Sequence, residues 1–240
     1  MNYLIQAVIS MPKRLLIILI PIILIYSFHA DTTGKKVRIS GQKNEDSLKI
    51  VFTKNIDFFA NVLLKGHSAS IRNYIRKYQP DSCGVIAYKN SDLKEGFEGV
   101  KAIRSVYSNK KADNVFVVPS FNHCDEGESY CFYDQTLPRL HTDSYCCHPS
   151  NLFVLPDMDE DGIKEIGIYY SSCTSRFKAL NIYSLKSGKW KEIASSTFDT
   201  FMKDSDKVRF DTLVKKISKS KFKVCNFADG KTNWEIVTMK

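Results

Sequence analysis

The chain has 240 residues and a formal net charge of +9, and it is 43% hydrophobic and 25% charged. This length suits one domain of about 200 residues, or two small ones, with a substantial apolar core. The composition is that of a globular protein and argues against intrinsic disorder, while lysines dispersed without interleaved aromatic residues argue against a nucleic-acid partner.

Residues 1–30 are the first predicted element, an export segment. Lys13 and Arg14 precede an uncharged apolar run, Leu15–Phe28, which is shorter than the roughly 20 residues of a spanning helix. We therefore expect residues 1–30 to be a cleaved signal peptide or a retained N-terminal membrane anchor. Residues 31–240 are then an exported domain, located in the periplasm, in the cell envelope or outside the cell. Membrane contact is expected only through residues 1–30, if they are not cleaved.

The next part of the chain predicts strands and one short helix. Lys35–Val62 is predicted to be mostly strand, because "KKVRIS" and "SLKIVFTKN", Ser47–Asn55, show apolar alternation. "SASIRNYIRKY", Ser68–Tyr78, combines helical spacing with a serine cap and predicts a short helix. Further strands are predicted at "CGVIAY", "AIRSVYS" and "NVFVVPSF", with a weaker signal at "SYCFYD".

The second half of the chain predicts mainly strands. "ALNIYSL" and "KWKEIAS" flank a turn at Lys186–Lys189, where Gly188 can take a positive φ, and this indicates a hairpin. A second helix is predicted at "DKVRFDTLVKKISK", Asp206–Lys219, followed by strands at "KFKVCNF" and "TNWEIVTM". The expected fold is α+β and β-rich, with antiparallel sheets and two short helices.

The sharpest signal is the acidic loop "DMDEDGIKE" at 157–165. Aspartates at loop positions 1, 3 and 5 precede a glycine at the sharp turn, and a backbone carbonyl and a carboxylate would follow at positions 7 and 9. Oxygen ligands at this spacing suit Ca²⁺, a hard ion that takes six to eight of them. The predicted ligands are Asp157, Asp159, Asp161, Ile163 and Glu165.

The loop is expected to join two strands rather than two helices. An EF-hand needs a glutamate at position 12, but Ile168 stands there, inside the alternating run "EIGIYY". The alternative is a polar turn whose acids face water. Two like charges about 4 Å apart repel by about 1 kcal/mol in water, so three converging aspartates favour a bound cation.

"DMDEDGIKEI" resembles the calcium loop of FG-GAP and VCBS-type repeats, as in integrin α-chain propellers and in single-copy versions from small exported bacterial proteins. The resemblance covers about residues 151–194. It implies a structural Ca²⁺ in a β-hairpin, held by the ligand positions named above. Because the chain carries a single copy of the motif, we expect a calcium-loop hairpin and not a full propeller.

The cysteines predict disulfide bonds. In an oxidising compartment their number suggests up to three disulfides and one leftover thiol. The alternative is a zinc site with ligands from His123, Cys124, Cys131, His141 and the Cys146–His148 stretch, but C-x₂₋₄-C pairs are absent from the sequence. The seven cysteines are Cys83, Cys124, Cys131, Cys146, Cys147, Cys173 and Cys225.

Catalytic motifs are not evident, since the sequence has no G-x-S-x-G elbow, H-E-x-x-H helix or phosphate-binding loop. A histidine such as His67 or an acid pair such as Asp125 with Glu126 could serve as an acid or base only in a suitable fold. We therefore expect an exported protein that binds a protein or polysaccharide rather than catalyses a reaction. The alternatives are a carbohydrate-active or surface-polysaccharide-related enzyme, and an inhibitor of a hydrolase.

Overall fold

The computed structural model describes residues 41–78, 85–121, 127–169, 175–199, 209–228 and 231–239. Apart from Gly41, the described residues belong to one compact unit, Gln42–Lys240. The predicted export segment, residues 1–30, lies outside the described residues. Within the described part of the chain, no helix is both long enough and apolar enough to cross a membrane.

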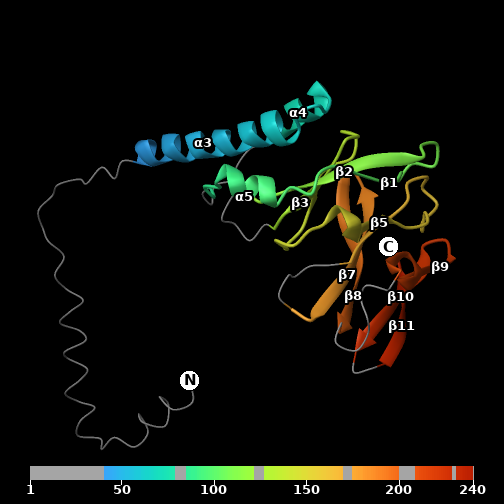
Figure 1. Cartoon of the computed structure of the whole chain (residues 1–240). Helices are drawn as coiled ribbons and strands as arrows, with labels where there is room; N and C mark the ends of the chain where they lie inside the picture. The colour runs from blue at the N-terminus through green and yellow to red at the C-terminus, as the bar shows by residue number, and fades with distance from the viewer. Residues whose placement is uncertain are drawn as a thin grey trace, which may run out of the picture. The chain divides into compact units, whose positions relative to one another are not determined.

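Three helices precede most of the sheet structure (Figure 1). Helix α3, Gly41–Phe58, continues into a π-helical turn, Phe59–Leu63, and is followed by α4, Ala69–Arg76, and α5, Asn90–Glu95. The expected helix at 68–78 is confirmed: the Ser68 side chain caps α4 by accepting from the Ile71 N–H, as a serine N-cap does.

The strand predicted at 47–55 is wrong, because this segment lies in α3. The strand predicted at "KKVRIS" lies outside the described residues. The deeply buried apolar residues of the helix at 47–58 are Phe52 and Ile56, followed by Phe59 in the π-helical turn. These positions are separated by four and then three residues, which is a helical spacing. The alternation in "SLKIVFTKN" does not correspond to burial, since Leu48 and Ile50 are exposed. Packing of the Phe52 side of the helix therefore decides the structure.

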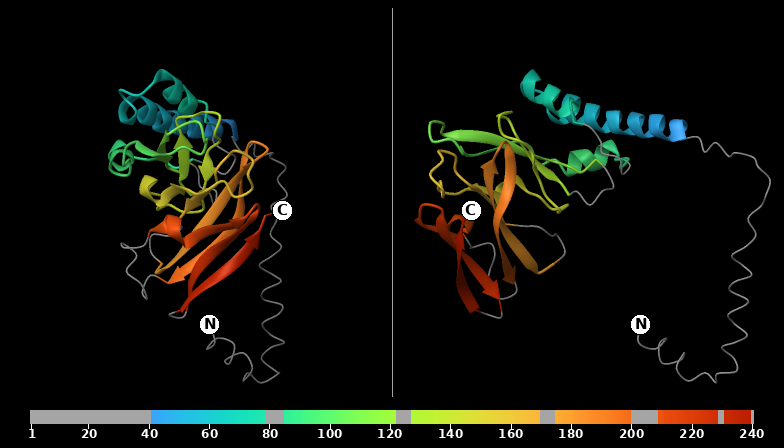
Figure 2. Two further views of the ribbon diagram at one scale, coloured as in Figure 1. Left: turned by 90° about the vertical axis from the view of Figure 1, so that its right-hand side faces the viewer. Right: turned by 180° about the vertical axis from the view of Figure 1, so that it is seen from behind.

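A four-stranded antiparallel sheet follows, with the order β1-β2-β3-β4. Phe116 and Val118 of its second strand pack with Phe59 and Phe121 in a helix-side core. The helices lie beside this sheet, on the side away from β9, β10 and β11 (Figures 1 and 2). The strands are β1, Lys101–Arg104; β2, Ala112–Val118; β3, Ser129–Phe132; and β4, Leu140–His141.

The rest of the described chain forms a seven-stranded sheet with the order β11-β10-β8-β7-β6-β5, in which β9 also pairs with β10. Its pairs are antiparallel except for one parallel bridge, Phe227↔Phe198. The expected β-rich α+β fold with antiparallel sheets, and without a full propeller, is confirmed. The strands are β5, Leu152–Val154; β6, Ile166–Ile168; β7, Phe177–Lys186; β8, Lys189–Asp199; β9, Val214–Ser218; β10, Lys221–Ala228; and β11, Lys231–Thr238.

The hairpin predicted around Lys186–Lys189 is confirmed, whereas the second predicted helix is not. At the β7–β8 turn, Ser187 and Gly188 both have positive φ, 51° and 73°, as a tight two-residue hairpin requires. The helix predicted at 206–219 is wrong where the structure describes it. A short 3₁₀ turn, Phe210–Leu213, leads into β9, which pairs with β10. Val214 faces Val224 across this pair and both are buried, so strand pairing overrides the helical spacing.

Candidate metal centre

The acidic loop connects β5 to β6, as the sequence predicted. The two strands pair in antiparallel register with Val154 opposite Ile166, and the Leu155 N–H donates to the Glu165 carbonyl at 2.8 Å. Met158 anchors the loop, because its side chain is fully buried and its carbonyl accepts from the Ser220 N–H at 2.8 Å. The loop is therefore held both by its own hairpin and by the turn between β9 and β10.

Asp157 organises the loop backbone. Its Oδ1 accepts from the N–H groups of Glu160, at 2.7 Å, and Asp161, at 3.2 Å, while its Oδ2 accepts from the Gly162 N–H at 2.9 Å. Glu160 and Gly162 take left-handed φ values of 61° and 91°, which lets the chain wrap around this carboxylate. The position-6 glycine thus has the role that the sequence predicts, since a positive φ favours glycine there.

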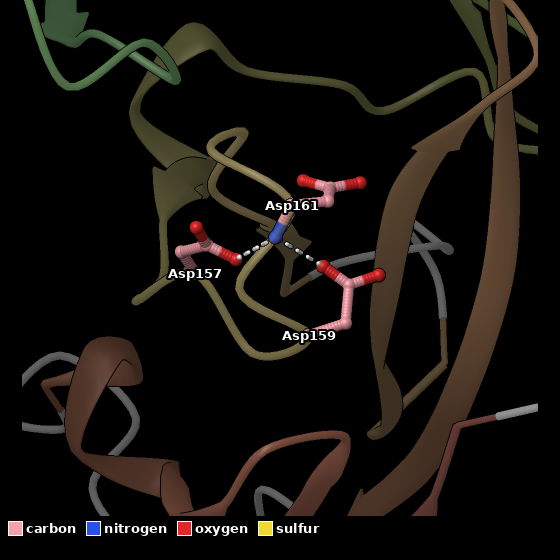
Figure 3. A group of neighbouring side chains, drawn as sticks. All are labelled: Asp157, Asp159 and Asp161. Atoms are coloured by element: carbon pink, nitrogen blue, oxygen red, sulfur yellow. Dashed lines mark hydrogen bonds between the residues drawn. The ribbon is translucent and has the colours of Figure 1, made fainter.

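Three carboxylates converge in this loop. Asp157, Asp159 and Asp161 each offer an oxygen, and these oxygens lie within 4.8 Å of one another, close enough to hold a metal ion. Figure 3 shows the three side chains around the bend of the loop, with the Asp161 N–H shared between Asp157 and Asp159. Carboxylate oxygens are hard ligands, so the cluster suits a hard cation better than a soft one.

Glu165 and Ile163 are not part of this three-carboxylate cluster. Glu165 is only 1% exposed, and its Oε2 accepts from the Met158 N–H at 2.6 Å, while its Oε1 is buried without a hydrogen-bond partner. Burial raises the pKa of Glu165 to about 7, and the charge of Asp159 adds to the increase. Ile163 closes the loop, where its N–H donates to Asp161 at 2.9 Å.

Two lysines that the sequence analysis did not identify neutralise the loop. The Lys186 Nζ, from the end of β7, donates to the carboxylates of Asp159 and Asp161, the latter at 3.0 Å. The Lys216 Nζ, from β9, donates to the Glu160 Oε1 at 2.9 Å and to the Asp157 carbonyl at 2.7 Å. Both lysines are distant in sequence, so no local pattern could have identified them.

The pKa values follow from this network. The hydrogen bond to Asp159 is the main cause that raises the pKa of Lys186. Partial burial opposes ionisation of Asp161, but hydrogen bonds from the Ile163 N–H and Lys186 outweigh it, so the pKa of Asp161 is lowered. The loop is therefore a charged network in which lysine ammonium groups lie on carboxylates that could also bind a cation.

The described cysteines are in two states. Cys146 is disulfide-bonded, whereas Cys131, Cys147 and Cys225 are buried thiols. Three of the seven cysteines are thiols, so the other four can form at most two disulfides. The maximum of three disulfides with one leftover thiol is therefore not reached. Burial raises the pKa of both Cys131 and Cys147 to about 12, so neither is a ready metal ligand at neutral pH.

The alternative zinc site is not assembled in the described part of the chain, where the three aspartates are the group found close enough to hold a metal. His123 and Cys124 of that hypothesis lie outside the described residues, as do Asp125 and Glu126. His148 contacts Glu98 instead.

Comparison with known proteins gives no match: no family model, no curated protein and no solved structure matches this chain.

Proposed function

We propose that the chain is an exported protein that acts by binding rather than catalysis, and that a structural Ca²⁺ occupies the acidic loop. The convergence of Asp157, Asp159 and Asp161 is the observation that supports the ion most directly. Ca²⁺ accepts an adaptable set of oxygen ligands, whereas the smaller Mg²⁺ demands a near-ideal octahedron, so this loop suits Ca²⁺ better. In this proposal the Ile163 carbonyl and the Glu165 carboxylate complete the ligand set.

The buried Glu165 carboxylate supports a stabilising role for the ion. An ionised carboxylate that is buried with one unpartnered oxygen is costly, and a nearby cation would offset that cost. In this proposal Ca²⁺ displaces the Lys186 ammonium from Asp159 and Asp161. At tenfold saturation the ion would stabilise the fold by about 1.4 kcal/mol.

Thermal unfolding in EDTA and then in excess Ca²⁺ tests this site. We expect Ca²⁺ to raise the melting temperature of the wild type and to leave Asp159→Asn unchanged. Glu160→Gln is the matched control, because it removes one charge from the same loop at a residue outside the cluster, and it should retain the response. A wild-type melt that does not respond to Ca²⁺ would refute the proposal.

A mixed aromatic and basic surface on β9, β10 and β11 supports the binding role. Lys215, Lys223 and Ile236 lie side by side across these strands, and Trp234 lies two residues from Ile236 on the same face of β11. The two lysine Nζ atoms lie 4.9 and 5.0 Å from the centre of the Trp234 ring. Trp234 and Ile236 are 38% and 60% exposed. We call these four residues the Trp234 face, and we propose that it binds an acidic polysaccharide through charge complementarity and ring contact.

Tryptophan fluorescence tests this partner, because Trp190 is hydrogen-bonded to the Pro138 carbonyl and only Trp234 belongs to the face. Titration with polygalacturonate should change the emission, and the change should weaken as salt is added. Neutral dextran should have no effect, and the Trp234→Phe variant should lose the signal. An equal response to anionic lipid vesicles would contradict a polysaccharide-specific face.

The enzyme alternative has one observation in its favour. Glu98 and His148 are in contact, and both influence the ionisation of Glu128, so two carboxylates and a histidine gather outside the acidic loop. Glu98 and His148 are both exposed by more than 40%, however, and neither is among the described residues that line the pocket beside Glu128. Catalysis would require these groups to face a common cleft, so binding is the function that we prefer.

A further inference from the structure

A pocket of about 240 Å³ opens between α5, the π-helical turn that follows α3, and the four-stranded sheet. Its described lining is mainly aromatic and aliphatic, and the charged residues in that lining are the two acids Asp92 and Glu128. Neither a lysine nor an arginine is among these lining residues. The lining residues used below are Phe59, Tyr88, Phe97, Glu128 and Tyr145.

The aromatic walls are fixed by contacts of their own. Phe59 and Phe97 pack edge to face with their ring centres 5.2 Å apart, and Phe59 is almost fully buried. The Tyr88 hydroxyl donates to the Ser120 carbonyl at 2.7 Å, which holds that ring in place. Tyr145 is 54% exposed and contributes a ring at the mouth of the pocket. The pocket is therefore largely preformed, as small-molecule sites usually are.

Glu128 places a carboxylate in this apolar lining. Its Oε2 accepts from the Cys147 N–H at 2.7 Å. Burial raises its pKa, with the nearby charge of His148 opposing this effect and that of Glu98 adding to it. The ammonium groups that neutralise the acidic loop have no counterpart in the described lining, so the Glu128 carboxylate lacks a counter-ion within the pocket.

We propose that this pocket binds an alkylammonium group, with Glu128 as the counter-ion and the aromatic rings around the alkyl substituents. A partly desolvated carboxylate strengthens a charge-assisted contact, and ring faces attract cations. The chain has a net charge of +9, so attraction of a cation must come from this local arrangement and not from the overall field. The site is separate from the acidic loop and from the Trp234 face, and it does not depend on either.

Isothermal titration calorimetry with choline tests the proposal, because its neutral isostere 3,3-dimethylbutan-1-ol has the same shape without the charge. We expect the wild type to bind choline and to bind the isostere at least about tenfold more weakly. Glu128→Gln should remove this preference while keeping an oxygen that accepts from the Cys147 N–H. Glu98→Gln removes the same charge outside the described lining and should retain the preference within about twofold.

A second variant and a second ligand complete the test. Tyr145→Ala removes an exposed ring without opening the core, and it should weaken choline binding by about threefold or more. A short peptide with one trimethylated lysine shows whether the ammonium can also be presented by a polymer, and binding of either ligand that depends on Glu128 supports the site. If neither binds, if the isostere binds as tightly as choline, or if Glu128→Gln retains the preference, the proposal is overturned.

Discussion

Glu165 and Glu128 lie in different regions of the molecule but have similar local environments. Each carboxylate accepts a hydrogen bond from one backbone N–H, that of Met158 at 2.6 Å for Glu165 and that of Cys147 at 2.7 Å for Glu128. Burial is the main cause that raises the pKa of both. Their surroundings differ in charge, and this difference separates the two sites.

Glu165 belongs to the same loop as the three clustered aspartates. Burial disfavours its ionisation, and the charge of Asp159 disfavours it further. Lysines from β7 and β9 relieve the excess negative charge on the loop, and a metal ion would do so more completely. Glu128 instead lies in a mainly aromatic and aliphatic lining that also contains Asp92, and the described lining provides no lysine or arginine. A buried carboxylate among other acids, as at Glu165, favours a structural ion, and a partly buried carboxylate beside aromatic rings, as at Glu128, favours an exchangeable organic cation.

The largest expected effect tests whether the two regions are energetically separate. Phe59 is 1% exposed, packs against Phe97 and stacks on Phe116, so Phe59→Ala should destabilise the protein by about 3–5 kcal/mol. The stability gained from Ca²⁺ should be unchanged, because the loop packs in the core of the seven-stranded sheet through Met158. Urea unfolding with and without Ca²⁺ measures both quantities.

Phe177→Ala is the control, because this phenylalanine is 49% exposed and its removal should cost less than about 1 kcal/mol. If Ca²⁺ no longer raised the free energy of unfolding of Phe59→Ala, the two regions would respond to the ion as one cooperative unit.

The next largest effect concerns pH and Glu165. The folded-state pKa of about 7 lies above that of an unfolded glutamate, so the stability from the neutral carboxyl is present below about pH 4.5 and is lost as pH rises through 7. In EDTA at about pH 8, Glu165→Gln should therefore be more stable than the wild type by about 1–3 kcal/mol. The two proteins should converge near pH 4, where the wild-type carboxyl is neutral as well.

Urea unfolding between about pH 4 and pH 8 gives the measurement, with Glu160→Gln as the control for loss of a loop charge. At high pH, excess Ca²⁺ should reduce the difference in free energy of unfolding between the wild type and Glu165→Gln. Parallel stability curves for the wild type and Glu165→Gln would contradict a costly ionised carboxylate at this position.

The sequence predicted the hairpin and the loop because both depend on local spacing. Asp157, Asp159, Asp161 and Gly162 are close in sequence, and a wrapped loop brings the three carboxylates together whatever surrounds it. The helix at Ser68 was predicted for the same reason, since a serine cap and helical spacing are local. Strands with clear alternation, such as β7 and β8, also needed no long-range information.

Long-range packing explains what the sequence did not predict. Lys186 and Lys216 reach the loop only because β7 and β9 lie beside it in the fold. The alternation at 47–55 predicted a strand and the spacing at 206–219 predicted a helix, but packing against neighbours in the fold gives a helix in the first segment and β9 in the second. Glu128 gave no signal of any kind, since its pocket is built from residues of α5, the π-helical turn and the four-stranded sheet.

A smaller effect distinguishes neutralisation by lysine from neutralisation by a metal ion. Lys186→Met removes the ammonium from Asp159 and Asp161, so in EDTA it should lower stability by about 1 kcal/mol. The same change should raise the affinity for Ca²⁺, because the ion no longer competes with the lysine. Lys189→Met, at an exposed position on the other side of the β7–β8 turn, should change neither quantity. A lower Ca²⁺ affinity in Lys186→Met would mean that lysine supports the site and does not compete with it.

The smallest effect completes the comparison of the two glutamates. The pKa of Glu128 is raised by burial, so its neutral form contributes stability below the ordinary pKa of a glutamate, and this contribution is lost as pH rises through the raised value. Glu128→Gln should therefore flatten the pH dependence in the same direction as Glu165→Gln, but by less than about 1 kcal/mol, because Glu128 is partly exposed and His148 opposes the shift. Choline should lower the pKa of Glu128 and restore part of the lost stability in the wild type, whereas Ca²⁺ should not. If Ca²⁺ rather than choline changed the contribution of Glu128, the carboxylate in the pocket would be coupled to Ca²⁺ binding in the acidic loop, and the two sites would not be independent.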